Sequence, residues 1–195
     1  MNDPENTAMK KYNFPFTIDS GHGEQLTFMQ LVTINGEERI EGISRCMPGA
    51  GPPFHTHLRQ DEGFTVTKGT MAIQVKGGEI RYLSAGQSAV FKRGEPHRFW
   101  NSGKDELVFN GWVQPAENFI FFLSTLYESR SKSPKGIPNL FDIAFLLTKY
   151  KNEYAMTDLN ILIRKIMIPG AYRIGKLTGK HSKFSDSPEP FRKSN

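Results

Sequence analysis

Three histidines and one glutamate stand at spacings that could bring them onto a single metal ion. His55 and His57 are two residues apart in an apolar run, and side chains two apart on a β-strand point to the same face. Glu62 follows at the start of another apolar run, and His97 lies 35 residues beyond it. Three neutral imidazoles and one carboxylate suit a borderline divalent ion, namely Fe, Mn, Ni, Cu or Zn. We therefore predict that these four residues bind one divalent transition metal.

The same four residues would leave room for catalysis. Four protein ligands close a tetrahedral ion but leave two open positions on an octahedral ion, where water, O₂ or a substrate oxygen can enter. Glu62 is the candidate catalytic residue, because it could bind the metal or leave it and act as a general base. If Glu62 and His97 face inward, strand alternation turns Phe64, Val66 and Phe99 inward as well. We expect these three side chains to form an apolar substrate pocket, and ordinary core packing is the alternative role.

Two longer stretches around these residues resemble the paired motifs of the cupins, a family of small β-barrel metalloproteins. The first reads Gly49-x5-His55-x-His57-x4-Glu62-x6-Gly69, and the second reads Gly86-x5-Lys92-x-Gly94-x2-His97-x3-Asn101. Lys92 is the one departure, because the cupin pattern has a proline there, which shapes a turn and is not a ligand. Taken alone, His55 and His57 could be ordinary strand residues. The agreement of ligands, glycines and spacings favours the metal site.

The resemblance implies a mainly β fold, a double-stranded β-helix or jelly-roll barrel with the metal inside it. The nearest functional analogy is a quercetinase-like, metal-dependent dioxygenase that acts on a small organic substrate, aromatic or enolic. Cupins are functionally diverse, however, so the fold alone does not name an activity. Two alternatives stay open, a zinc-dependent cyclase or isomerase on the same scaffold and a non-catalytic module that binds a small molecule. Among the three possibilities we favour the dioxygenase, which is an enzyme of the oxidoreductase class.

Hydrophobic periodicity divides the chain into a β-rich part and a helical part. Short apolar runs separated by turn residues fill 26–113, and Asn35-Gly36 is the clearest hairpin turn. After Pro115 the period changes from that of a strand to that of a helix. One face of the first predicted helix carries five large side chains, Phe119, Phe122, Leu123, Leu126 and Tyr127. We predict that this face packs on the barrel or contacts a second subunit.

Two further helices are predicted after the first. The second has Asn139 as its N-cap and extends to Tyr154, and the third ends or kinks near Pro169. Residues from 180 onward are polar and contain two prolines, which is typical of disorder. We therefore expect a flexible leader over 1–12, a cupin barrel with the metal site over 13–115, a helical extension over 116–179 and a disordered tail over 180–195.

Charge is distributed unevenly along the chain. Residues 1–129 hold 12 Lys/Arg and 15 Asp/Glu, whereas residues 130–195 hold 13 and 5, so the net charge of +5 comes from the helical part. A basic amphipathic helix there could contact an anionic membrane surface. We expect no nucleic-acid partner, because no recognition motif is present. A homodimer is expected, because cupins commonly pair through sheet edges.

The cellular setting is predicted from three features of the sequence. Cys46 is the single cysteine, so no disulfide can form within the chain. The first residues are polar and do not form the apolar core of a secretion signal. No apolar stretch approaches the roughly 20 residues of a membrane span. We therefore expect a cytoplasmic protein that acts on a small-molecule substrate.

Overall fold

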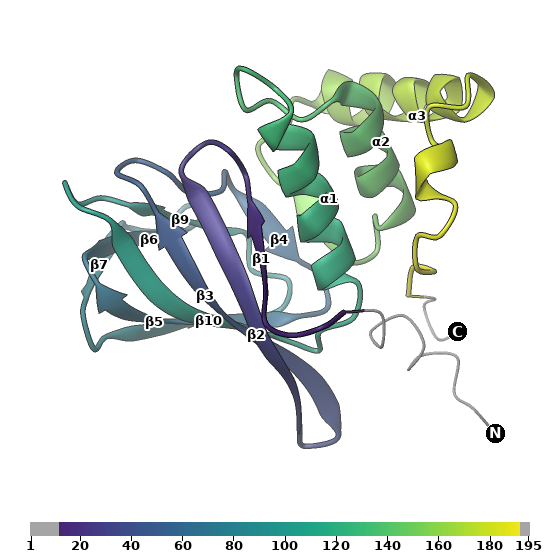
Figure 1. Cartoon of the computed structure of the whole chain (residues 1–195). Coiled ribbons are helices and arrows are strands. Elements are labelled where there is room, and N and C mark those ends of the chain that lie inside the picture. The colour runs from purple at the N-terminus through teal and green to yellow at the C-terminus, as the bar shows by residue number, and fades with distance from the viewer. Residues whose placement is uncertain (1–11, 192–195) are drawn as a thin grey trace.

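Two antiparallel sheets pack face to face in the computed structural model, which describes residues 12–191 (Figure 1). The larger sheet has the order β1 (Phe16–Asp19), β2 (Glu24–Ile34), β3 (Glu37–Cys46), β10 (Leu107–Gln114), β5 (Asp61–Lys68) and β8 (Ser88–Phe91). The smaller sheet has the order β11 (Tyr154–Met156), β4 (His55–His57), β9 (His97–Asn101), β6 (Thr70–Val75) and β7 (Arg81–Ser84). This is the predicted jelly-roll barrel. The predicted leader falls outside the described residues, apart from Tyr12.

The hydrophobic core between the sheets follows from the alternation of side chains along each strand. Phe64, Val66, Met71, Phe109 and neighbouring residues are buried between the sheets. The hairpin between β2 and β3 turns at Asn35 and Gly36, whose φ angles are 54° and 82°. Two consecutive positive φ angles are typical of a tight hairpin turn, so this prediction is confirmed.

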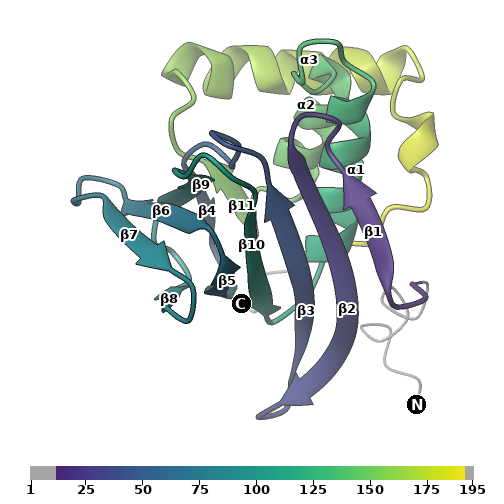
Figure 2. The same ribbon diagram turned by 60° about the vertical axis from the view of Figure 1, so that its left-hand side comes forward.

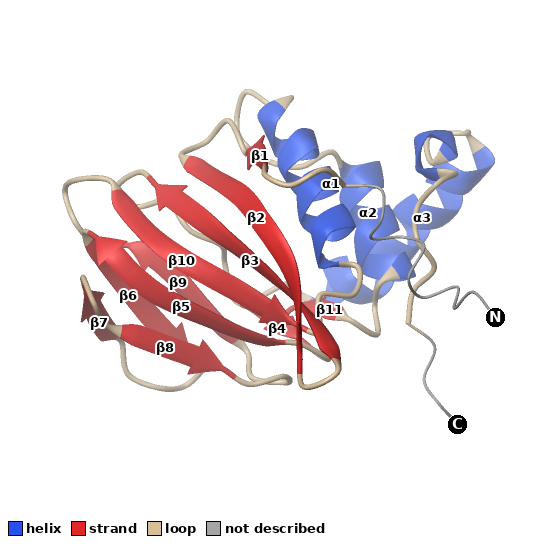
Figure 3. Ribbon diagram, turned by 60° about the horizontal axis from the view of Figure 1, so that its bottom comes forward, coloured by secondary structure: helices blue, strands red, loops and turns tan. Residues whose placement is uncertain are grey.

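Three α-helices stand against one end of the barrel (Figure 3). They are α1 (Phe119–Ser131), α2 (Leu140–Lys149) and α3 (Ile168–Leu177), and a π-helical turn, η3 (Ile163–Met167), leads into α3. Asn139 caps α2 as predicted, because its Oδ1 accepts a hydrogen bond from the N–H of Phe141 at 2.9 Å. The third helix continues past Pro169, which lies in the first turn of α3, where its missing N–H is tolerated. No helix in 12–191 is long and apolar enough to cross a membrane.

The chain after α2 differs from the sequence prediction. The second helix ends at Lys149, and Tyr154 lies on the short strand β11, which pairs with β4 so that Tyr154 faces His57 and Met156 faces His55. The extension is therefore attached to the strand that carries two predicted ligands.

The tail also differs from the prediction, because residues up to 191 pack on the helices. The short 3-10 helix η4 (Ser182–Phe184) buries Phe184, whose ring stacks on Phe145 with centroids 4.2 Å apart. Farther on, the Tyr150 hydroxyl donates to the carbonyl of Pro188 at 2.8 Å. The prediction of disorder is wrong for this segment, because its apolar side chain finds a partner that only the folded chain provides. Residues 192–195 lie outside the description.

Candidate metal centre

The four predicted ligands meet inside the barrel. His55 and His57 come from β4, and His97 comes from the neighbouring strand β9, directly opposite His55 in register. Glu62 reaches the same point from β5 in the other sheet. One ligand atom from each residue lies within 4.8 Å of the ligand atoms of the other three. The fold thus brings together all four residues that the sequence analysis singled out as ligands.

The distances between these atoms fit a shared metal ion. The Oε2 atom of Glu62 lies 2.8 Å from Nε2 of His97, 3.6 Å from Nε2 of His57 and 3.8 Å from Nε2 of His55. Ligand atoms about 2.1 Å from an ion and at right angles to each other are roughly 3 Å apart. Three nitrogens and one oxygen therefore converge at about the spacing that a first-row divalent ion requires.

Two of the histidines are oriented by backbone carbonyls. Nδ1 of His55 lies 3.0 Å from the carbonyl oxygen of Pro53, and Nδ1 of His97 lies 2.9 Å from that of Glu95. A carbonyl can only accept, so each Nδ1 carries a proton, and Nε2 is the nitrogen that a metal ion would bind. Metal-binding histidines usually have such a partner on the other nitrogen.

Burial and charge set the protonation states of Glu62 and His57. Burial raises the pKa of Glu62, but the surrounding imidazoles outweigh this effect and hold the pKa below its usual value, so the side chain is a carboxylate. Burial lowers the pKa of His57 to about 3, so its imidazole is neutral. Burial lowers the pKa of His97, but the hydrogen bond to the Glu62 carboxylate outweighs this effect and raises the pKa, so a metal ion would replace the proton between these two side chains. Metal ions bind carboxylates and neutral imidazoles, and the residues present therefore fit a divalent ion.

The turn before His97 shows how the chain accommodates its departure from the cupin motif. The N–H of Lys92, which a proline would lack, donates to Oε2 of Glu95 at 2.6 Å. The carbonyl of Glu95 in turn holds Nδ1 of His97. The His97 ring also stacks on Phe91, with centroids 4.0 Å apart and an angle of 5° between the planes. A hydrogen bond replaces the rigidity of the proline ring, and the ligand remains fixed.

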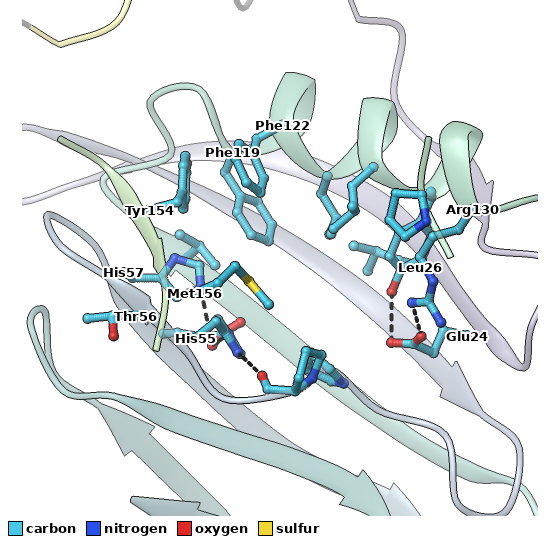
Figure 4. Close-up of a pocket in the computed structure, with 18 of the residues that line it drawn as sticks. Glu24, Leu26, His55, Thr56, His57, Phe119, Phe122, Arg130, Tyr154 and Met156 are labelled. Atoms are coloured by element: carbon cyan, nitrogen blue, oxygen red, sulfur yellow. Dashed lines mark hydrogen bonds and ion pairs between the residues drawn. The ribbon is translucent and has the colours of Figure 1, made fainter. Parts of the chain in front are cut away.

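A cavity of about 570 Å³ opens above the centre, and it extends from the barrel to beneath the helices (Figure 4). Phe64 and Phe99, two of the three side chains expected in a substrate pocket, line this cavity, whereas Val66 does not. The placement of Val66 in the pocket is therefore corrected: this side chain lies in the core between the sheets and is 1% exposed. His55, His57 and Glu62 are in the wall, whereas His97 is fully buried and does not line the cavity.

Most of the other wall residues were not identified from the sequence as pocket residues. The five large side chains on one face of α1 all line the cavity, although the sequence predicted only a packing role for them. Two strand glycines, Gly42 and Gly111, and a partly buried ion pair between Glu24 and Arg130 were also not predicted from the sequence. Glycine inside a strand often marks a site that a ligand approaches closely, and that signal could have identified Gly42 and Gly111.

Comparison with known proteins gives a family match for the central part of the chain. A family model described as the cupin domain matches residues 42–113. Over 70 residues the chain is 37% identical to oxidoreductase iacF of Pestalotiopsis fici, a match that covers 35% of this chain and 34% of the relative. Over 106 residues it is 34% identical to the probable oxidoreductase virH of Hypocrea virens, covering 50% of this chain and 48% of the relative. The chain thus spans less than half the length of either relative.

One solved structure is similar to part of this chain. It is an uncharacterized conserved protein with a double-stranded β-helix domain from Klebsiella pneumoniae, which is 26% identical with a TM-score of 0.38. The match covers 44% of this chain and 74% of the other.

Proposed function

Because its residues 42–113 make this chain a member of the cupin superfamily, we propose that it is a metal-dependent dioxygenase acting on a small organic substrate. One observation carries the proposal. Three imidazole nitrogens and the Glu62 carboxylate converge beside an apolar cavity. The two relatives named as oxidoreductases support the reaction class.

Each side chain of the centre has a separate task in this proposal. His55, His57, His97 and Glu62 would hold the ion, and a bound divalent ion supplies the redox chemistry with O₂ that amino-acid side chains lack. Oε2 of Glu62 faces the imidazoles, whereas Oε1 has no hydrogen-bond partner among the described residues. Oε1 is therefore free to take a proton from a substrate hydroxyl that lies in the cavity.

The cavity wall would protect the reaction from water. Phe64, Phe99 and Phe119 lie around the mouth of the centre, and Phe119 packs within 5.8 Å of the His57 ring, measured between centroids. Apolar walls orient an organic substrate through shape and exclude the water that would compete for open ligand positions. The same walls strengthen the electrostatic interactions between Glu62 and a substrate proton.

A zinc-dependent cyclase or isomerase is the alternative on this scaffold. It would use the same ligands and the same base. The donor set argues against it, because four protein ligands close a tetrahedral zinc ion and leave no position for a substrate. An octahedral ion keeps two positions open, and this is the reason that we favour an iron-like ion and O₂ chemistry.

The test begins with metal content. The purified chain is stripped and reloaded without air with Fe(II), Mn(II), Ni(II), Cu(II) or Zn(II), one at a time. We expect about one ion per chain, a tenfold or greater loss of affinity in His57→Ala, and unchanged binding in His22→Gln, a control whose ring contacts the carbonyl of Ser133. O₂ uptake is then measured with flavonols, catechols and enols. A chain that binds no ion would refute the metal site, whereas a loaded chain that consumes no O₂ would refute only the dioxygenase.

A further inference from the structure

The cavity has two chemically different ends. One end holds the metal ligands, and Figure 4 shows Glu24 and Arg130 at the opposite end, with Leu26 beside them. The wall between the ends is built from apolar side chains of the larger sheet and of α1. A volume of about 570 Å³ lies within the range of pockets that bury a whole organic ligand. A cavity of this shape and lining fits an elongated, mostly hydrophobic molecule.

Two glycines widen the floor of this cavity. Gly42 of β3 and Gly111 of β10 are register partners, and both line the cavity. A Cβ atom at Gly42 would lie 2.7 Å from the carbonyl oxygen of Thr27, so the packing explains that glycine. A Cβ atom at Gly111 would lie 3.6 Å from the nearest atom, a carbon of Phe64, which is an ordinary contact. The packing therefore does not require a glycine at position 111, and the need to leave space for a ligand explains why a glycine is there.

The far end offers hydrogen bonds without a net charge. Nη1 of Arg130 pairs with Oε2 of Glu24, and Nε of Arg130 donates to the carbonyl of Gly136 at 3.2 Å. The Tyr127 hydroxyl donates to Oε1 of Glu24 at 3.4 Å. Nη2 of Arg130 has no hydrogen-bond partner in the described part of the chain. Because the ion pair is neutral overall, it suits an uncharged oxygen better than a carboxylate, which Glu24 would repel.

We infer that the substrate is an elongated hydrophobic molecule with a hydroxyl or carbonyl group at its far end, and that Arg130 and Glu24 bind this oxygen. A hydroxyl would accept from Nη2 of Arg130 and donate to Glu24. This inference rests on the proposed function in one respect, which is that the end of the substrate beside the metal ligands is the end that reacts. The far end and the glycine floor can be tested by binding alone.

The experiment measures binding to the metal-free protein by isothermal titration calorimetry. The probes are 4,4′-dihydroxybiphenyl and 4-hydroxybiphenyl, which differ only in the second hydroxyl. We expect the first probe to bind roughly three- to tenfold more tightly, the contribution of one buried hydrogen bond. The double variant Glu24→Gln with Arg130→Met removes both charges together and should abolish this preference. Equal binding of the two probes to the wild type, or a preference that survives in the double variant, would overturn the role of the pair.

The glycine floor is tested with the same probes. Gly111→Ala should weaken both by about tenfold, because the new methyl group enters the cavity. Gly170→Ala is the matched control, since a Cβ there meets open space on α3. If Gly111→Ala does not fold, Leu123→Trp fills the cavity from the α1 side. Unchanged affinity in either cavity variant would refute the proposal that the probes bind in this cavity beside Gly111. Probe binding without any O₂ uptake would refute the reaction and leave the binding site in place.

A second, independent observation concerns the outer surface of α3. Six large apolar side chains on α3 and the turns before it are 48–87% exposed, namely Ile161, Leu162, Ile166, Met167, Ile174 and Leu177. Residues 159–185 contain six Lys or Arg residues and no Asp or Glu. Figure 2 shows α3 running across the top of the molecule, over the ends of α1 and α2.

We propose that this surface binds an anionic membrane. Exposed apolar side chains can enter the boundary between headgroups and acyl chains, and the cations beside them attract anionic lipids. A second copy of the chain is a poorer partner, because two such faces would repel each other through their like charges. A nucleic acid would leave the six apolar side chains without a role.

The test is co-sedimentation of the full chain with vesicles. We expect binding to vesicles with 30% phosphatidylserine at low salt, little binding to pure phosphatidylcholine, and loss of binding in 0.5 M NaCl. Ile174→Ser with Leu177→Ser should weaken binding about tenfold, whereas Val90→Ser, an exposed apolar control on β8, should not. Equal binding to both kinds of vesicle, no binding to either, or a dimer in solution that the α3 substitutions dissociate would each overturn the proposal.

Discussion

The buried Nδ1 atom of His57 and the buried Oε1 atom of Gln60 belong to neighbouring side chains, and neither has a hydrogen-bond partner among the described residues. The orientation of the Gln60 amide is fixed, because its nitrogen donates to Oε2 of Glu117 at 3.1 Å and to the Tyr154 hydroxyl at 3.0 Å. Its oxygen is thus left without a partner, and we expect it to accept a hydrogen bond from the N–H of His57. Such a hydrogen bond would keep Nε2 of His57 available for a metal.

Replacing Gln60 should therefore weaken metal binding although Gln60 is not a ligand. We expect Gln60→Leu to lower the affinity for the preferred ion by about 10- to 100-fold, the usual effect of losing a group that orients a metal-binding histidine. Competition with a coloured chelator measures the affinity. Gln30→Leu, an exposed change on β2, serves as the control. Equal affinity in the two variants would show that Gln60 does not orient the ring.

The ligand set could be predicted from the sequence because the determining pattern is local. His55 and His57 share a strand, and their spacing alone places them on one face. Glu62 and His97 depend on barrel topology, and only the resemblance to a known motif supplied that topology. The groups that orient the ring nitrogens, such as the carbonyl of Pro53, could not be predicted, because backbone direction is set by the folded turn.

The helical extension shows where the sequence pattern gives no reliable signal. Strand β11 has three residues and lies next to β4, which is about 100 residues earlier in the chain. A strand of three residues is too short to show a hydrophobic periodicity. Tyr154 also fits the helical spacing of the apolar residues before it, so the sequence predicted a helix there. The sequence showed the apolar face of α1. An apolar face that lines a cavity and one that packs in a core have the same pattern of apolar residues, however. Only the packing of the folded chain distinguishes the two.

Metal binding should stabilise the fold measurably. An ion that binds only the native state at 100 times its dissociation constant adds about 2.7 kcal/mol to the free energy of unfolding. For a chain of this size, this corresponds to a rise in Tm of roughly 5–10 °C. Calorimetry with and without the ion should show this rise in the wild type and not in His57→Ala. The same rise in His57→Ala would indicate that the ion binds elsewhere.

The outer face of the larger sheet contains a glycine that the packing does require. Trp112 of β10 is the register partner of Gly63 on β5, and a Cβ atom at Gly63 would overlap the indole ring. We expect Gly63→Ala to lower the free energy of unfolding by about 1–3 kcal/mol. In a Trp112→Ala background the same change should have little effect, because the overlapping ring is gone. Urea unfolding of the four proteins in this cycle measures the coupling, and a value near zero would contradict the overlap.

Glu117 should make the stability of the protein depend on pH. Burial raises the pKa of Glu117 to about 7, against the partly compensating hydrogen bond from Arg59, whose Nε lies 3.1 Å from Oε1. Between about pH 4.5 and 7 the folded carboxyl holds a proton that the unfolded chain has released, so the free energy of unfolding falls as pH rises through this window. The full effect is at most about 3 kcal/mol. Urea unfolding of the metal-free protein at pH 5 and pH 8 should show a smaller loss in Glu117→Gln than in the wild type. Equal losses would mean that Glu117 titrates normally, and a larger loss in the variant would reverse the sign of the effect.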